Sequence, residues 1–130
     1  MKITKIDTFL VNMGHRNIPY VKVHTDEGIY GVGEPYSCGP DKATVEVIKD
    51  FEEWLIGRDP RDIEGLYQLM YAGSRFPGGM VLNAAISGIE HALWDIAGKA
   101  AGCRSIGWLA ANVATRSVFI RLRVAIARKS

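Results

Sequence analysis

The chain has 130 residues, a net charge of +2 and an apolar fraction of 48%, values typical of one globular domain with a modest core. No apolar run reaches the ~18 residues of a membrane helix, and residues 1–5 precede no apolar stretch, so we expect neither a membrane partner nor a secretory signal. Cys38 and Cys103 stand in no metal-binding spacing. Free thiols, and hence a cytoplasmic protein, are predicted.

The first third has the period-two pattern of β-strands. Apolar residues alternate over residues 6–10, 21–24 and 29–34, with a polar loop at 12–17 and a turn at Asp26-Glu27-Gly28. Ile3 breaks the alternation, which indicates a β-bulge. The pattern predicts an antiparallel meander of three strands.

Helical periodicity follows from about residue 41. Apolar side chains share one face near 41–56, 60–72 and 80–101, which predicts three helices. Gly57 suits the position after a helix, and Asp59 with Pro60 suits an N-cap followed by proline at the first helical position. Strands followed by helices argue for an α+β fold, a three-stranded meander followed by a helical bundle.

A narrow polar stripe marks the otherwise apolar and small-residue helix predicted at 80–101: it contains Asn83, Ser87, Glu90, His91, Asp95 and Lys99. His91 and Asp95 have the i, i+4 spacing that suits either a metal or a mutual pair. No third ligand is visible, so we expect no metal and interpret the stripe as a buried or interface surface. Asp95 with Lys99 is expected to form an ordinary helix pair.

The Gly31-Val32-Gly33 segment has part of a dinucleotide-binding pattern, but Tyr36 occupies the place of its third glycine. No βαβ unit follows it. We therefore expect the two glycines to lie beneath a ligand or against another backbone.

Several short motifs occur together in order. The predicted meander ends in Gly31-Val32-Gly33-Glu34 and is followed by Gly57-Arg58-Asp59-Pro60, Gly78-Gly79 and Ser87-Gly88-Ile89-Glu90-His91-Ala92-Leu93-Trp94-Asp95-Ile96. Residues 1–102 thereby resemble the N-terminal capping domain of the enolase superfamily, in its mandelate racemase/muconate lactonizing enzyme group and closest to the acid-sugar dehydratases. The resemblance implies a domain that covers a catalytic barrel, and it leads us to expect a homo-oligomer.

The resemblance also implies a chemistry that lies outside these residues. In such enzymes the barrel holds Mg²⁺ with three acidic ligands, and its bases abstract a proton next to a carboxylate, as in sugar-acid dehydratases, racemases and cycloisomerases. A barrel needs roughly 250 residues, so we expect no catalytic barrel in this chain. We expect no catalytic residue, no metal and no cofactor in this chain. The parent enzyme would be a Mg-dependent lyase or isomerase acting on a sugar acid.

Capping loops supply the candidate substrate-binding residues. By the resemblance, His15 and Arg16 lie in a loop over the mouth of the barrel, and a guanidinium suits a carboxylate or hydroxyl groups. Tyr36 and Phe76, with their neighbours Ser37 and Arg75, are weaker candidates on the same argument. Solvated loops without a ligand are the alternative for all of them.

The last segment departs from the family. Residues 104–130 contain six lysines and arginines and no aspartate or glutamate. Residues 1–103 contain ten lysines and arginines and fourteen aspartates and glutamates. Codons compatible with Cys103 to Ala111, read one base out of frame, spell Val-Pro-Val-Asp-Arg-Leu-Ala-Gly-Gly, which is close to the family pattern. We therefore expect an aberrant basic tail at 103–130, from truncation or a frameshift after about residue 102.

Three interpretations follow. The first is a capping and specificity domain that is inactive by itself. The second is a noncatalytic module that pairs with a separate barrel or with itself. The third is a basic nucleic-acid-binding protein, which we disfavour because residues 118–126 alternate like a strand and no groove-reading motif is present.

Overall fold

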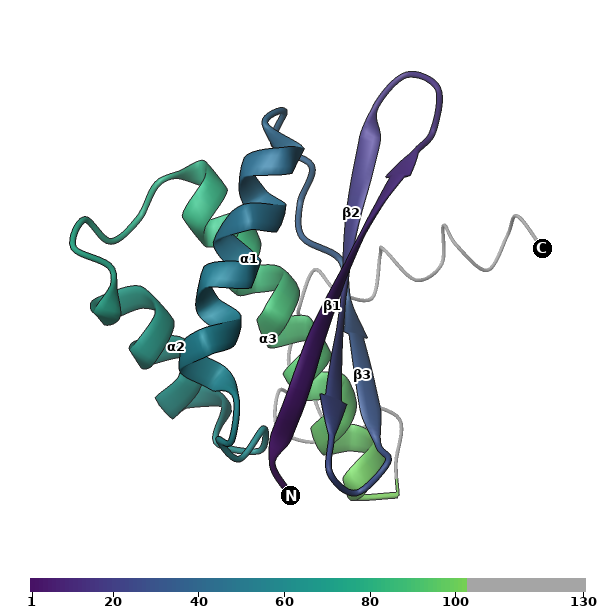
Figure 1. The fold of residues 1–130 in the computed structure, drawn as a ribbon, viewed down its shortest axis with the longest axis vertical. Coiled ribbons are helices and arrows are strands. Elements are labelled where there is room, and N and C mark those ends of the chain that lie inside the picture. Colours follow the sequence, from purple (N-terminus) through teal and green to yellow (C-terminus); the bar gives the residue numbers. More distant parts are fainter. Residues whose placement is uncertain (103–130) are drawn as a thin grey trace, which may run out of the picture.

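The computed structural model describes residues 1–102, as one antiparallel sheet with two helices, α1 and α3, packed on one of its faces and a third, α2, packed against those two helices (Figure 1). The elements are β1 (Ile3–Asn12), β2 (Asn17–Thr25), β3 (Tyr30–Gly33), α1 (Asp41–Leu55), α2 (Ile63–Gly73) and α3 (Met80–Ala100). This confirms the α+β prediction, and the described residues contain no barrel. The predictions made for residues 103–130 lie outside the described residues.

The sheet has the strand order β1-β2-β3, with both pairs antiparallel. Ile6 pairs with Val23 and Thr8 with Val21, and the register shifts between Ile3 and Lys5, which confirms the predicted bulge. The Ile6 amide points away from β2 and donates to the Glu52 carboxylate of α1 at 2.8 Å. The first half of β1 is thereby tied to α1.

The core lies between the inner face of the sheet and the helices. Val21 and Val23 of β2 are fully buried, and α1 contributes the predicted face of Thr44, Ile48, Phe51 and Leu55. From α3 come Ala85, Ile89, Ala92, Leu93 and Ile96, all buried. The apolar face of the strands and the apolar faces of the helices therefore pack together in one core, as the sequence predicts.

Glycines let β3 lie directly on α3. A Cβ at Gly31 would overlap the carbonyl oxygen of Ala92, and one at Gly33 would overlap that of Gly88. Gly88 in turn faces the ring of Pro35. The two glycines of the Gly31-Val32-Gly33 segment thus serve close backbone packing, which was the favoured interpretation over a dinucleotide loop.

The predicted start of the second helix is wrong. α2 begins at Ile63, and its N-cap is Asp62, whose side chain accepts from the Gly65 amide at 3.2 Å. Asp59 instead accepts hydrogen bonds from the Arg61 amide at 2.9 Å and from the Arg61 guanidinium. Both Asp59 and Asp62 could cap the helix by their residue type. Residues 57–58 form backbone hydrogen bonds with Ile3 of β1, which keeps the chain at Asp59 outside the helix, so Asp62 is the N-cap.

The Asp95–Lys99 pair of α3 reaches the outer edge of β3. Lys99 Nζ lies 2.7 Å from Asp95 Oδ2, as expected for a helix pair. The same carboxylate accepts from the Val32 amide at 3.1 Å, and Lys99 Nζ donates to the Tyr30 carbonyl at 2.6 Å. Both charged side chains are therefore bound to backbone groups of an edge strand.

None of the helices in residues 1–102 is both long and apolar enough to cross a membrane.

Candidate substrate-capping loops

Three loops lie at one end of the domain, which we call the apical loops: residues 13–16, 34–40 and 74–79. The first is the turn between β1 and β2, and the other two lead directly into α1 and α3. Figure 1 shows the turn and the starts of both helices at the upper end, opposite the N-terminus and the turn at 26–28. These loops are up to 66 positions apart in sequence, counted from residue 13 to residue 79, and Figure 1 shows the β1–β2 turn and the loop before α3 on opposite sides of the domain.

Backbone groups and asparagine side chains hold the β1–β2 turn. The Met13 amide donates to the Arg16 carbonyl at 2.9 Å, and the Gly14 amide donates to Asn12 Oδ1 at 2.8 Å. Neither the His15 imidazole nor the Arg16 guanidinium takes part in this structure, and both residues are exposed. The turn thus presents a cationic side chain at the apical end without using it for folding.

Two large aromatic residues are exposed in the other apical loops. Tyr36 is 73% exposed in the loop after β3, and Phe76 is 90% exposed in the loop before α3. A phenylalanine held in water has no stabilising role in the domain itself, because it buries no apolar area. Such residues are typical of a surface that closes on something else.

The loop at 34–40 is anchored from below. Ser37 Oγ donates to Asp41 Oδ2 at 3.2 Å, and Cys38 Sγ lies 3.7 Å from the hydroxyl of the buried Thr44. Asp41 is only 5% exposed, and its Oδ1 has no hydrogen-bond partner. Sequence reasoning missed Asp41; its position at the start of a helix, after Pro40, is the signal that could have drawn attention to it.

Further apical residues were missed as well. Met13 and Met80 are exposed beside the predicted candidates, as are Phe9, Leu10 and Val11 on the outer half of β1. The available signal was the uninterrupted Phe9-Leu10-Val11 run, which breaks the alternation expected of a strand with one buried face. Leu10 is exposed although it follows Ile6 and Thr8 in the alternation, and Figure 1 shows the outer half of the hairpin leaning away from the helices.

The structure brings His15, Arg16, Tyr36 and Phe76 to the same end without joining them. No hydrogen bond, ion pair or ring contact connects any two of the four within residues 1–102. No group of three or more His, Cys, Asp or Glu side chains in the described residues could hold a metal ion. The described residues therefore do not provide a site that fits Mg²⁺.

A cleft of about 660 Å³ opens elsewhere, between the start of α2 and the last turns of α3. Its lining includes Ile63, Trp94 and Ala97, with Glu90 from the polar stripe, and Trp94 Nε1 donates to Glu90 Oε1 at 3.4 Å. None of the four predicted site residues lines it. It is distinct from the apical loops.

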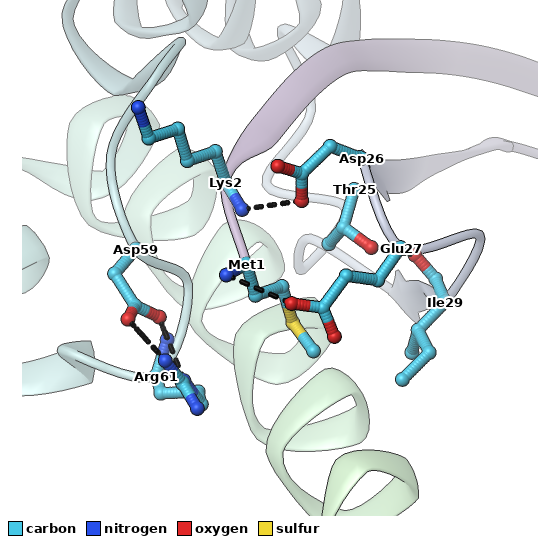
Figure 2. A network of polar contacts seen from close by, with 8 residues as sticks. All are labelled: Met1, Lys2, Thr25, Asp26, Glu27, Ile29, Asp59 and Arg61. Carbon is cyan, nitrogen blue, oxygen red and sulfur yellow. Dashed lines mark hydrogen bonds and ion pairs between the residues drawn. The ribbon is translucent and has the colours of Figure 1, made fainter.

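Charged groups at the opposite end hold the start of the chain (Figure 2). The Met1 amino group lies 2.9 Å from Glu27, whose hydrogen bond raises the pKa of that amino group. The Lys2 amide donates to Asp26 at 2.7 Å. The Arg61 guanidinium, bonded to Asp59, lowers the pKa of that carboxyl to about 2. These groups pair with one another, so this network is structural.

Comparison with known families decides the identity of the fold. The sequence profile of the mandelate racemase / muconate lactonizing enzyme N-terminal domain matches residues 4–106. The chain belongs to this family. The resemblance drawn from the glycine motifs and the 87–96 segment is thereby confirmed.

Curated relatives are D-galactonate dehydratases. The chain is 44% identical over 102 residues to that of Variovorax paradoxus and 42% identical over 99 residues to that of Cronobacter sakazakii. These matches cover 78% and 76% of this chain but only 26% and 25% of the relatives. The chain thus spans about a quarter of the length of the curated relatives that it matches.

Solved structures of the superfamily have the same fold. An enolase from Agrobacterium radiobacter, with sodium and L-malate bound, superposes with a TM-score of 0.74 at 40% identity over 78% of this chain and 26% of its own. An enolase from Pantoea ananatis, with D-gluconate and magnesium bound, gives a TM-score of 0.73 at 37% identity over 77% of this chain and 25% of its own. Both of those proteins hold an organic acid.

Proposed function

We propose that residues 1–102 are the capping and substrate-selecting domain of a Mg-dependent acid-sugar dehydratase. The observation that carries the proposal is the exposure of Arg16, Tyr36 and Phe76 on apical loops of a domain 44% identical to D-galactonate dehydratases. These residues belong to three loops from separate places in the sequence, one between β1 and β2, one before α1 and one before α3.

The three side chains offer complementary contacts to a sugar acid. The Arg16 guanidinium can donate two parallel hydrogen bonds to a carboxylate. The Tyr36 hydroxyl can donate to or accept from a sugar hydroxyl. Phe76 is purely apolar and can exclude water from the ligand once the loops close. In this scheme His15 is a further hydrogen-bonding group beside Arg16.

The metal belongs to the part of the enzyme that these residues do not include. Because residues 1–102 offer no cluster of three ligating side chains, the domain's part in the reaction is to bind, orient and shield the substrate. Mg²⁺ bound in the part of the enzyme that follows this domain would stabilise negative charge on the substrate carboxylate. We accordingly expect no dehydratase, racemase or cycloisomerase turnover from the 130-residue chain alone.

A chimera tests the proposal. Residues 1–102 replace the matching quarter of the Variovorax paradoxus D-galactonate dehydratase, and turnover of D-galactonate is measured with Mg²⁺. We expect activity in the chimera and none in the same enzyme lacking its first quarter. A folded chimera without turnover of D-galactonate or any other sugar acid would overturn the proposal. Adding the 130-residue chain in trans to the shortened enzyme tests the separate-module alternative.

Variants of the apical loops then test the contacts. In an active chimera, Arg16→Ala should raise KM for the acid about tenfold or more, because a charge-assisted pair is lost. Phe76→Ala should lower kcat more than it changes KM if its role is to exclude water during reaction. Lys49→Ala, on the exposed side of α1 and further along the helix from the apical loops, serves as the matched surface control and should change neither.

A further inference from the structure

The two edges of the sheet differ in how their backbone groups are covered. On β3, Asp95 accepts from Val32 and Lys99 donates to Tyr30, so α3 covers that edge. On the first half of β1, Ile3 exchanges backbone hydrogen bonds with residues 57–58, and Ile6 donates to Glu52. Coverage of an exposed edge prevents pairing with another chain.

The second half of β1 has no such cover. Successive residues of an antiparallel strand point their backbone groups to opposite sides. Since the Ile6 amide points away from β2, the N–H and C=O groups of Thr8, Leu10 and Asn12 point to the same outer side. Within residues 1–102 nothing bonds to these outward groups.

This uncovered segment, residues 8–12, is also apolar and uncharged. It reads Thr-Phe-Leu-Val-Asn, and Phe9, Leu10 and Val11 are 50%, 38% and 41% exposed. Natural edge strands normally contain a charged side chain, often lysine, or a proline, and either one blocks pairing with another strand. Residues 8–12 contain none of these, and they lie in the second half of β1, where the hairpin leans away from the helices (Figure 1).

We propose that residues 8–12 of β1 pair antiparallel with the same residues of a second copy of this chain, centred on Leu10. In this register Leu10 exchanges both backbone hydrogen bonds with Leu10 of the second copy, and Thr8 pairs with Asn12. Phe9 then lies opposite Val11, and an aromatic residue opposite a β-branched one is a stabilising cross-strand pair. The two three-stranded sheets become one continuous sheet.

A second copy fits better than an unrelated strand because the segment complements itself. A twofold axis through Leu10 brings every outward donor of residues 8–12 to an outward acceptor of the same segment. No like charges meet across the axis, since the segment has no ionisable side chain. Glu52 holds the Ile6 amide and so ends the pairing on one side, while the turn at 13–16 ends it on the other.

The test uses the 130-residue chain and two charge variants. Light scattering with size exclusion should give a dimer for the wild-type chain. Leu10→Lys and Leu10→Glu each place identical charges directly opposite one another on the axis, so each variant alone should be monomeric. An equimolar mixture of the two should recover a heterodimer, because opposite charges then meet at that position.

Two further variants keep the test independent of folding defects. Thr8→Pro removes an outward amide and adds no charge, and it too should yield a monomer with an unchanged circular dichroism spectrum. Val32→Lys adds the same charge to an exposed apolar residue of β3, whose edge is covered, and should remain a dimer. A monomeric wild-type chain, a dimeric Leu10→Lys chain or failure of the mixture to pair would each overturn the proposal.

Discussion

The backbone amide of Val32 donates a hydrogen bond to the carboxylate of Asp95, 3.1 Å away and 63 positions later in the chain. The same carboxylate pairs with Lys99, which binds the Tyr30 carbonyl. One helical turn of α3 thus satisfies a donor and an acceptor of β3 that would otherwise face solvent. A surface ion pair is worth little by itself, but this one also closes a sheet edge.

Removing the Asp95 carboxylate should therefore cost more than breaking an ordinary surface pair. We expect Asp95→Ala to lower the free energy of unfolding by about 1–2 kcal/mol, because a charge-assisted hydrogen bond and an ion pair are both lost. Asp95→Asn retains an acceptor for Val32 and should cost less. Lys49→Ala breaks the exposed Glu46–Lys49 pair, which touches no backbone group, and should change stability by less than about 0.5 kcal/mol. Urea unfolding measures all three, and equal effects of Asp95→Ala and Lys49→Ala would contradict the expectation.

The contact between β3 and α3 should be intolerant of a single methyl group. Gly33→Ala places its Cβ against the Gly88 carbonyl and Gly31→Ala against the Ala92 carbonyl. Since the obstacles are backbone atoms, the helix must shift, and we expect each substitution to cost about 3 kcal/mol or to prevent folding. Val32→Ala lies between them on the exposed side and should cost less than about 1 kcal/mol. Thermal unfolding of the three variants provides the comparison.

Local patterns predicted the elements of this fold well. The alternation in the first third, the bulge at Ile3 and the apolar face of α1 all follow from residues close in sequence, and each is confirmed. The glycine contact was also predictable, because Gly31 and Gly33 fit neither a turn nor a complete dinucleotide motif. For the candidate site, the sequence indicated the loops, and the resemblance supplied the reason to choose Arg16.

Features set by distant contacts were not predictable in the same way. The start of α2 depends on the Arg58 carbonyl bonding to the Ile3 amide at 2.9 Å, which holds residues 57–61 outside the helix. The edge contacts of Asp95 and Lys99 join residues more than 60 positions apart. The exposure of Leu10 depends on how the outer half of the hairpin leans away from the helices, which no residue near Leu10 determines.

Acid should weaken the domain partly through Asp59. Its pKa is about 2 in the folded chain, below the ordinary value of 3.8, so its stabilising effect is complete well above pH 3.8 and is lost as the pH falls towards 2. Asp59 and Arg61 are 42% and 56% exposed, so solvent screening keeps the effect below about 1 kcal/mol. Asp59→Asn should lose stability less steeply than the wild type between pH 4 and 2. Arg61→Gln removes the guanidinium but keeps the backbone amide that donates to Asp59, so it should flatten the curve only in part. Parallel dependence of unfolding stability on pH in all three chains, measured with urea, would refute the assignment.

The loop that presents Tyr36 should depend on one hydroxyl. Ser37 donates to a carboxylate that is 5% exposed and whose other oxygen is already unpaired. In Ser37→Ala both oxygens of Asp41 lack a partner, which carries a penalty of about 1–3 kcal/mol unless water reaches them. The loop should therefore open more often, and amide hydrogen exchange should accelerate for residues 36–39 while the buried residues Ile48 and Phe51 of α1 remain protected.

Two companion variants separate this effect from a general loss of packing. Ser37→Thr keeps the hydroxyl and should exchange like the wild type. Ser37→Ala combined with Asp41→Ala removes both partners, so no buried carboxylate is left unpaired, and the double variant should be more stable than Ser37→Ala alone. Such recovery would identify the unpaired carboxylate as the cause of opening. If Ser37→Ala exchanges at the wild-type rate across residues 36–39, the hydroxyl does not anchor the loop, and the position of Tyr36 must depend on the packing of Pro35 against Gly88.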